Sequence, residues 1–169
     1  EIPKRDWSSD VCSSDLCVLS DRLAATAALI IGMTNTQLEC RRRRPLPMMV
    51  LAGSGDQYQS YEGAIAKSGV LLSVPDTVAV WRTRNGCVGQ TEETLPDRDP
   101  TDETTVTVIR PAGCGGGKGE AEVAFSRING AGHNIPRLTG GTIDRDSKTN
   151  RDIETAEEVW KFFAKFSRQ

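Results

Sequence analysis

Apolar residues in this chain gather in short runs separated by polar, glycine-rich or proline-rich segments. The first run, from Leu23 to Met33, is almost continuous, and a second follows Pro47 over residues 48–52. Continuous apolar runs of this length are typical of strands that are covered on both faces. Residues 104–110 alternate threonines with valines, and residues 122–128 place Val123 and Phe125 on one side. We therefore predict four strands.

A helix is predicted to begin after Ser73. Ser73 is suited to cap the first turn, Pro75 is compatible with that turn, and Asp76 occupies the position that completes a capping box. The sequence Asn85-Gly86 is a typical helix end. The predicted apolar face of this helix consists of Val74, Val78 and Trp81.

A second helix is predicted at the C-terminal end of the sequence. Its apolar positions recur with helical spacing and are Ile153, Ala156, Trp160, Phe163 and Phe166. Strands that alternate with helices favour an α/β architecture with a mainly parallel sheet.

Composition places the chain among ordinary globular proteins, with 37% hydrophobic residues and a formal net charge of −2. The apolar run 23–33 is shorter than the roughly 20 residues that a transmembrane helix needs, so we expect no membrane partner. The four arginines at positions 41–44 have no accompanying aromatic residues, and we expect a solvated loop and no nucleic-acid partner.

Cofactor and metal motifs are also absent from the sequence. The glycine-rich segment 113–119 has Ala112 and Gly119 at two positions where a phosphate-binding loop needs glycine and serine or threonine. A zinc site needs several histidine, cysteine or acidic ligands at short spacing, and the chain has one histidine. We expect neither a cofactor nor a metal.

The first residues of the chain have an unusual sequence. Residues 6–16 read DWSSDVCSSDL, which one reading frame of a common sequencing adapter also encodes. The segment has neither a helical nor a strand period. We interpret residues 1–16 as adapter-derived and disordered, the alternative being a genuine polar arm, and residues 17–169 as the folded part.

Two residues carry the chemistry that we expect. Asp56 and His133 each follow a predicted strand in a glycine-flanked turn, and the order aspartate then histidine is that of the second and third members of a catalytic triad in α/β hydrolases. Asp56 could instead be a turn former, and His133 could be structural. No Gly-x-Ser-x-Gly motif, which would carry the serine nucleophile, occurs in the chain.

Several segments, in the same order, resemble the polyhydroxybutyrate depolymerase and feruloyl esterase family. Residues 17–25 (CVLSDRLAA) are similar to the family's CELSDRFAA, and residues 53–56 with 61–63 are similar to its HGTADPVVPYEGG. The segment from Trp81 to Cys87 resembles the family's W..RNGC, and residues 130–136 resemble its GGGHTWPG. The departures are Ala52 for the motif's histidine, residues 57–60 for Pro-Val-Val-Pro, and Ile135 for tryptophan.

The resemblance implies the C-terminal part of an α/β-hydrolase fold, with a mainly parallel sheet flanked by helices and the N-terminal strands missing. It further implies a carboxylic-ester hydrolase with a Ser-Asp-His triad, in which Asp56 and His133 are catalytic and the chain stops short of the nucleophile. The expected partner is an ester of a polyester or a plant polysaccharide. The alternative hypothesis is a non-catalytic domain of the same fold that binds a polymer or a protein.

Four cysteines remain once residues 1–16 are set aside, an even number that suits disulfides in an oxidising compartment. Four cysteines allow three pairings. We expect Cys17 to pair with Cys40 and Cys87 with Cys114, because each pair brackets neighbouring elements. The expected location is therefore outside the cell or in the periplasm.

Overall fold

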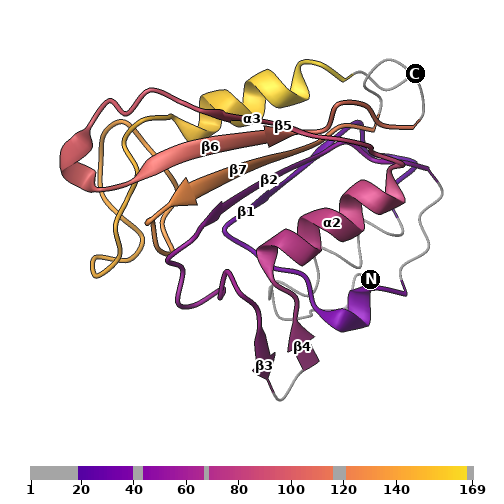
Figure 1. The fold of residues 1–169 in the computed structure, drawn as a ribbon, viewed down its shortest axis with the longest axis horizontal. Helices are drawn as coiled ribbons and strands as arrows, with labels where there is room; N and C mark the ends of the chain where they lie inside the picture. Colours follow the sequence, from indigo (N-terminus) through magenta and orange to yellow (C-terminus); the bar gives the residue numbers. More distant parts are fainter. Residues whose placement is uncertain (1–18, 40–43, 67–68, 116–120, 167–169) are drawn as a thin grey trace, which may run out of the picture.

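A computed structural model describes residues 19–39, 44–66, 69–115 and 121–166. Its centre is a five-stranded sheet in the order β1-β2-β7-β6-β5 (Figure 1). The strands are β1 (Thr26–Leu29), β2 (Met48–Gly53), β5 (Thr91–Thr94), β6 (Thr105–Arg110) and β7 (Val123–Asn129). The predicted segment 1–16 lies outside the described residues.

The sheet is mixed, so the predicted mainly parallel sheet of α/β-hydrolase type is wrong. β1, β2 and β7 run parallel, whereas β6 is antiparallel to β7 and β5 is antiparallel to β6. The pairing of Ile109 with Phe125 places the end of β6 beside the start of β7. Residues 111–122 therefore join adjacent strand ends as a hairpin connection does, and such a connection gives antiparallel strands.

The helix α2 (Val74–Arg84) covers one face of the sheet, and its predicted start is confirmed. The side chain of Ser73 accepts a hydrogen bond from the backbone N–H of Asp76 (3.0 Å). Alternate residues of β2 and β7 point toward α2 and pack with it. This core cluster contains Met48, Val50, Ala52, Val123, Phe125, Ile109, Val74, Val78 and Trp81.

The helix α3 (Thr155–Phe163) covers the opposite face, as Figure 1 shows. Its predicted apolar face is wrong in part, because Trp160 is 72% exposed, whereas Phe162 is 4% exposed. The helix is rotated relative to the prediction, so that Phe162 contacts the sheet and Trp160 faces the solvent. The core on this side contains Met49, Leu51, Val106, Val108, Ala124, Ile128, Ala131, Ile153 and Phe162.

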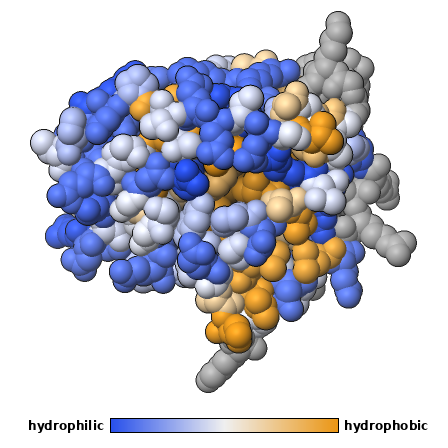
Figure 2. Space-filling view, in the orientation of Figure 1, coloured by the Kyte–Doolittle hydropathy of each residue, from blue (hydrophilic) through white to orange (hydrophobic). Residues whose placement is uncertain are grey.

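A small antiparallel hairpin, β3 (Ala64–Ala66) with β4 (Gly69–Leu71), projects from the body of the molecule. Two short 3-10 helices, η1 (Asn35–Gln37) and η2 (Pro100–Asp102), complete the described elements. The space-filling view shows apolar surface toward the lower end of the molecule, where this hairpin lies (Figure 2). Ile65, within β3, is 90% exposed.

Candidate active site

The two predicted site residues follow neighbouring strands. β2 and β7 are parallel partners, with Gly53 opposite Ile128. The carboxyl ends of two parallel neighbours lie at the same edge of a sheet, so the turns after β2 and β7 leave the sheet side by side. This arrangement brings the turn that holds Asp56 against the turn that holds His133.

Backbone hydrogen bonds join the two turns. The N–H of Ser54 donates to the carbonyl of Ile128 (2.9 Å), and the N–H of Gly55 donates to the carbonyl of Ala131 (2.8 Å). In the other direction, the N–H of Gly130 donates to Oγ of Ser54 (2.8 Å). Ser54 therefore serves as a linker between the turns.

Gly53 is required by the close approach of the two turns. A Cβ atom on Gly53 would lie 2.4 Å from the carbonyl oxygen of Ala131 and 2.6 Å from that of Gly132. Backbone atoms cannot move aside as a flexible side chain can, so a larger residue would push the turns apart.

Asp56 and His133 form a hydrogen-bonded pair. Oδ2 of Asp56 lies 2.8 Å from Nδ1 of His133, and the Asp56 side chain is 2% exposed against 25% for His133. The other carboxylate oxygen, Oδ1, accepts hydrogen bonds from the backbone N–H groups of Tyr58 (2.9 Å) and Gln59 (2.8 Å). Both oxygens of the carboxylate are thus engaged, and these three bonds fix its orientation.

This geometry determines what His133 can do. A carboxylate next to Nδ1 favours the tautomer in which Nδ1 carries the proton, which leaves a lone pair on Nε2. No side chain in the described part of the molecule hydrogen-bonds to Nε2. His133 is therefore arranged to accept a proton at Nε2, as a general base does.

Tyr58 lies beside the imidazole. The ring centroids of Tyr58 and His133 are 5.4 Å apart at an interplanar angle of 57°, and Tyr58 is 70% exposed. A tilted aromatic contact of this kind restricts the rotation of the imidazole and covers part of it from water.

Asn134, the residue after His133, anchors the following loop. The residue is 2% exposed, and its side chain donates to the carbonyls of Asp144 (2.8 Å) and Ser147 (2.9 Å). Its Oδ1 accepts from the N–H groups of Ile143 (2.9 Å) and Asp144 (2.8 Å). A buried amide with all these bonds made fixes residues 143–147 against the residue that follows His133.

The same loop brings a second carboxyl group near His133. The hydroxyl of Ser147 donates to Oδ2 of Asp144. This bond, followed by a bond from the backbone N–H of Asp146, lowers the pKa of Asp144, and the positive charge of His133, when present, lowers it further. Asp144 is partly buried and bonds to neither Asp56 nor His133, so it adds negative charge beside the pair without being part of it.

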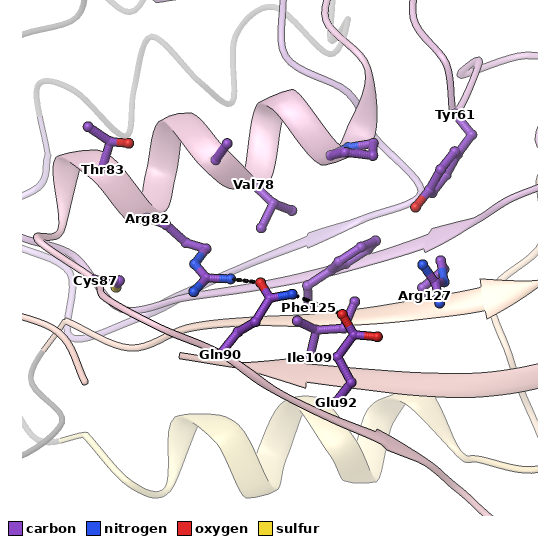
Figure 3. A pocket seen from close by; sticks show the side chains of 12 residues that line it. Tyr61, Val78, Arg82, Thr83, Cys87, Gln90, Glu92, Ile109, Phe125 and Arg127 are labelled. Carbon is purple, nitrogen blue, oxygen red and sulfur yellow. Dashed lines mark hydrogen bonds between the residues drawn. The ribbon is translucent and has the colours of Figure 1, made fainter. Parts of the chain in front are cut away.

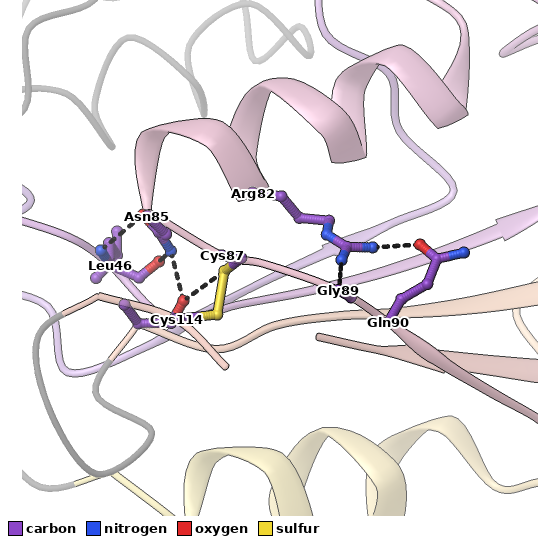
Figure 4. The surroundings of a disulfide bond; sticks show 8 residues. Leu46, Arg82, Asn85, Cys87, Gly89, Gln90 and Cys114 are labelled. Carbon is purple, nitrogen blue, oxygen red and sulfur yellow. Dashed lines mark hydrogen bonds between the residues drawn. A yellow bond between two sulfur atoms is a disulfide. The ribbon is translucent and has the colours of Figure 1, made fainter. Parts of the chain in front are cut away.

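The predicted disulfide between Cys87 and Cys114 is present, with a Cα–Cα distance of 3.7 Å (Figure 4). Beside it, buried Asn85 donates from Nδ2 to the carbonyls of Leu46 (2.8 Å) and Ala121 (2.9 Å). These contacts tie the end of α2 to the residues that precede β2 and β7. Cys17 and Cys40 lie outside the described residues.

Sequence reasoning missed three of these contributors. The sequence marks Tyr58 only as part of a departure from the family motif, and Asn85 only as a helix end. Asn134 carried a usable signal, because an asparagine next to a proposed catalytic histidine in a glycine-rich loop can bond the backbone on several sides. Its partners, Asp144 and Ser147, could be assigned only from the structure.

Neither a metal site nor a membrane span is found in the parts of the chain that the structure covers. Among those residues no group of three or more histidine, cysteine, aspartate or glutamate side chains could hold a metal ion. No helix there is long and apolar enough to cross a bilayer. Comparison of the chain with protein-family models, curated proteins and solved structures yields no match.

Proposed function

We propose that Asp56 and His133 are the acid and the base of a serine carboxylic-ester hydrolase. The observation that carries the proposal is the 2.8 Å contact between Oδ2 of Asp56 and Nδ1 of His133, while no side chain of the described residues bonds to Nε2. The proposal rests on this pair and on the resemblance of its two turns to secreted esterases, and it does not depend on an α/β-hydrolase fold.

In this reaction His133 accepts the proton of a serine hydroxyl at Nε2 while the serine oxygen attacks the ester carbonyl. The tetrahedral intermediate then collapses, the bond to the alcohol oxygen breaks, and His133 returns the proton to the leaving alcohol. Water repeats the cycle, releases the acid and restores the serine. Asp56 stays ionised and stabilises the imidazolium that forms in each half.

The nucleophile is the missing part of this site. In the described residues no serine hydroxyl bonds to His133. We propose that the serine belongs to sequence that precedes Cys17 in the parent protein, so that the present chain does not turn over esters by acyl transfer. The substrate would be a polyester or an ester of a plant polysaccharide, met outside the cell or in the periplasm, where the Cys87–Cys114 disulfide is stable.

The test uses residues 17–169 joined to the coding sequence that precedes Cys17 in the source DNA. We expect hydrolysis of p-nitrophenyl butyrate, and a decrease in kcat by about three to four orders of magnitude in His133→Ala and in Asp56→Asn. The matched control is Glu93→Gln, the same acid-to-amide change on the exposed strand β5.

Two results would overturn the proposal. One is an extended protein that folds but does not hydrolyse p-nitrophenyl butyrate. The other is activity that His133→Ala leaves unchanged. Far-UV circular dichroism of each variant separates lost chemistry from lost structure.

A second candidate function is a non-catalytic binding module. The observation that favours it is a cavity of about 480 Å³ that neither Asp56 nor His133 lines. Esterase assays with and without the sequence that precedes Cys17 distinguish the two candidates. A binding module shows no esterase activity in either form, and it retains its ligand when His133 is replaced.

A further inference from the structure

The cavity lies between α2 and the sheet, over strands β5, β6 and β7 (Figure 3). Its floor is apolar, and it consists of Val78 from α2, Ile109 from β6 and Phe125 from β7, all less than 8% exposed. Its volume of about 480 Å³ falls within the range of about 300–1,000 Å³ that is usual for small-molecule sites.

Two side chains of opposite charge, Glu92 and Arg127, lie next to this floor. Glu92 is opposite Ile109, which is opposite Phe125, so the three side chains share the face toward α2. Arg127 is two residues beyond Phe125 on β7 and points to the same face. Strand spacing separates the Cα atoms of Glu92 and Arg127 by about 12 Å, with the apolar floor next to both.

The two charges do not neutralise each other. The described residues include no salt bridge between Arg127 and Glu92. Nε of Arg127 donates to Oδ1 of Asn129 (2.8 Å), and Arg127 also bonds to the Tyr61 hydroxyl, so its remaining terminal N–H groups are left for another acceptor. Oε1 of Glu92 accepts from the side chain of Gln90 (2.9 Å), which leaves Oε2 for another donor.

Tyr61 brings a hydroxyl group to the same end of the cavity. Its partial burial raises the pKa of the phenol, and Arg127 opposes that rise while Glu92 adds to it. Both charges therefore act on the Tyr61 hydroxyl, which stays protonated and can donate a hydrogen bond to an anionic group held by Arg127.

Polar contacts line the other end of the cavity. Nη1 of Arg82 donates to Oε1 of Gln90 (2.6 Å), as Figure 3 shows, and Nη2 donates to the carbonyl of Gly89. The guanidinium of Arg82 is therefore engaged by Gln90 and Gly89 in the wall of the cavity. The charged groups that remain available to a ligand are those of Arg127 and Glu92, and the Tyr61 hydroxyl lies with them.

We propose that this cavity binds a small zwitterion with an apolar body, namely a free amino acid or short peptide with an apolar side chain. Its carboxylate would pair with Arg127 and Tyr61, its ammonium group with Glu92, and its side chain would cover Phe125 and Ile109. A plain anion would be repelled by Glu92, and a plain cation by Arg127. An uncharged apolar ligand would desolvate both charges without replacing their water, which is unfavourable.

The inference goes beyond the proposed esterase function and does not rest on it. The test is isothermal titration calorimetry of the full 169-residue chain with four probes of one apolar body: L-phenylalanine, N-acetyl-L-phenylalanine, L-phenylalaninamide and N-acetyl-L-phenylalaninamide. The second lacks the ammonium group, the third lacks the carboxylate, and the fourth lacks both. We expect L-phenylalanine to bind at least about tenfold more tightly than each of the others, because each lost ionic contact costs about 1.4 kcal/mol or more.

Variants locate the site. Arg127→Gln and Glu92→Gln should each weaken the binding of L-phenylalanine about tenfold. The matched controls are Arg110→Gln on β6 and Glu93→Gln on β5, whose Nη1 and Oε2 atoms are 3.5 Å apart and whose exposed side chains point to the other face of the sheet. These controls and His133→Ala should bind as the parent chain does.

The proposal is overturned if L-phenylalanine does not bind, if the uncharged analogue binds as tightly, or if the controls weaken binding as much as Arg127→Gln. Binding that survives Glu92→Gln and Arg127→Gln together would also overturn it. Circular dichroism spectra that match the parent show that a variant is folded. Loss of esterase activity in the extended protein with intact binding would contradict only the proposed function.

Discussion

Oδ2 of Asp56 lies 2.8 Å from Nδ1 of His133, although 77 residues separate them in the chain. The contact exists because β2 and β7 are parallel neighbours in register, so that both turns leave the sheet at one edge. A shift of one residue in this register would turn the apolar residues of β7 to the opposite face of the sheet. The packing of both core clusters therefore fixes the register and keeps Asp56 beside His133.

The pair determines the tautomer of His133. We expect the neutral imidazole to carry its proton on Nδ1, and replacement of Asp56 by alanine to move the proton toward Nε2, because the acceptor beside Nδ1 is lost. The chain has one histidine, so the imidazole 15N shifts are unambiguous. Glu93→Ala is the control, and a parent protein with its proton on Nε2 would contradict the assignment.

Gly53→Ala should destabilise the protein. The new Cβ atom would lie 2.4 Å from the carbonyl oxygen of Ala131, and the turns must separate to admit it. We expect the free energy of unfolding to fall by about 1–3 kcal/mol in urea denaturation. Gly141→Ala is the control, because a Cβ there has no atom within 4 Å. Equal stability of the two variants would refute the close approach.

Ser147→Ala should raise the pKa of Asp144. The largest cause of the lowered pKa is the hydrogen bond from the Ser147 hydroxyl, and the substitution removes it. Because the folded-state pKa is lowered, the contribution of Asp144 to stability is present above the ordinary carboxyl pKa of about 3.9 and is lost as the pH falls through the folded value. A 13C NMR titration of the Asp144 carboxyl carbon measures its pKa in the parent and in Ser147→Ala. An equal pKa in both proteins would contradict the assigned role of Ser147.

The disulfide should stabilise the protein by closing a loop in the unfolded chain. Cys87 and Cys114 are 27 residues apart, for which the chain-entropy relation gives about 3.5 kcal/mol. We expect the double substitution Cys87→Ser with Cys114→Ser to lower the free energy of unfolding by about that amount. Substitution is preferable to a reductant, which would act on the chain's other cysteines as well. An unchanged urea midpoint would count against the pairing.

Local sequence signals predicted the elements that depend on neighbouring residues. The start of α2 follows from Ser73 and Asp76, whose bond closes within one helical turn. The strand β5 was missed because Thr91–Thr94 is entirely exposed and offers no alternation of apolar and polar residues. It is the edge strand of the sheet, and its backbone pairs only with β6 among the described strands.

The sequence by itself determined that Asp56 and His133 follow strands in glycine-flanked turns, and that Cys87 and Cys114 could pair. Only the tertiary structure decided which strands are neighbours, that β6 runs against β7, and that Phe162 rather than Trp160 packs on the sheet. The physical reason is that strand pairing and helix rotation depend on contacts between distant segments. Periodicity marks a face as apolar without identifying the surface that covers it.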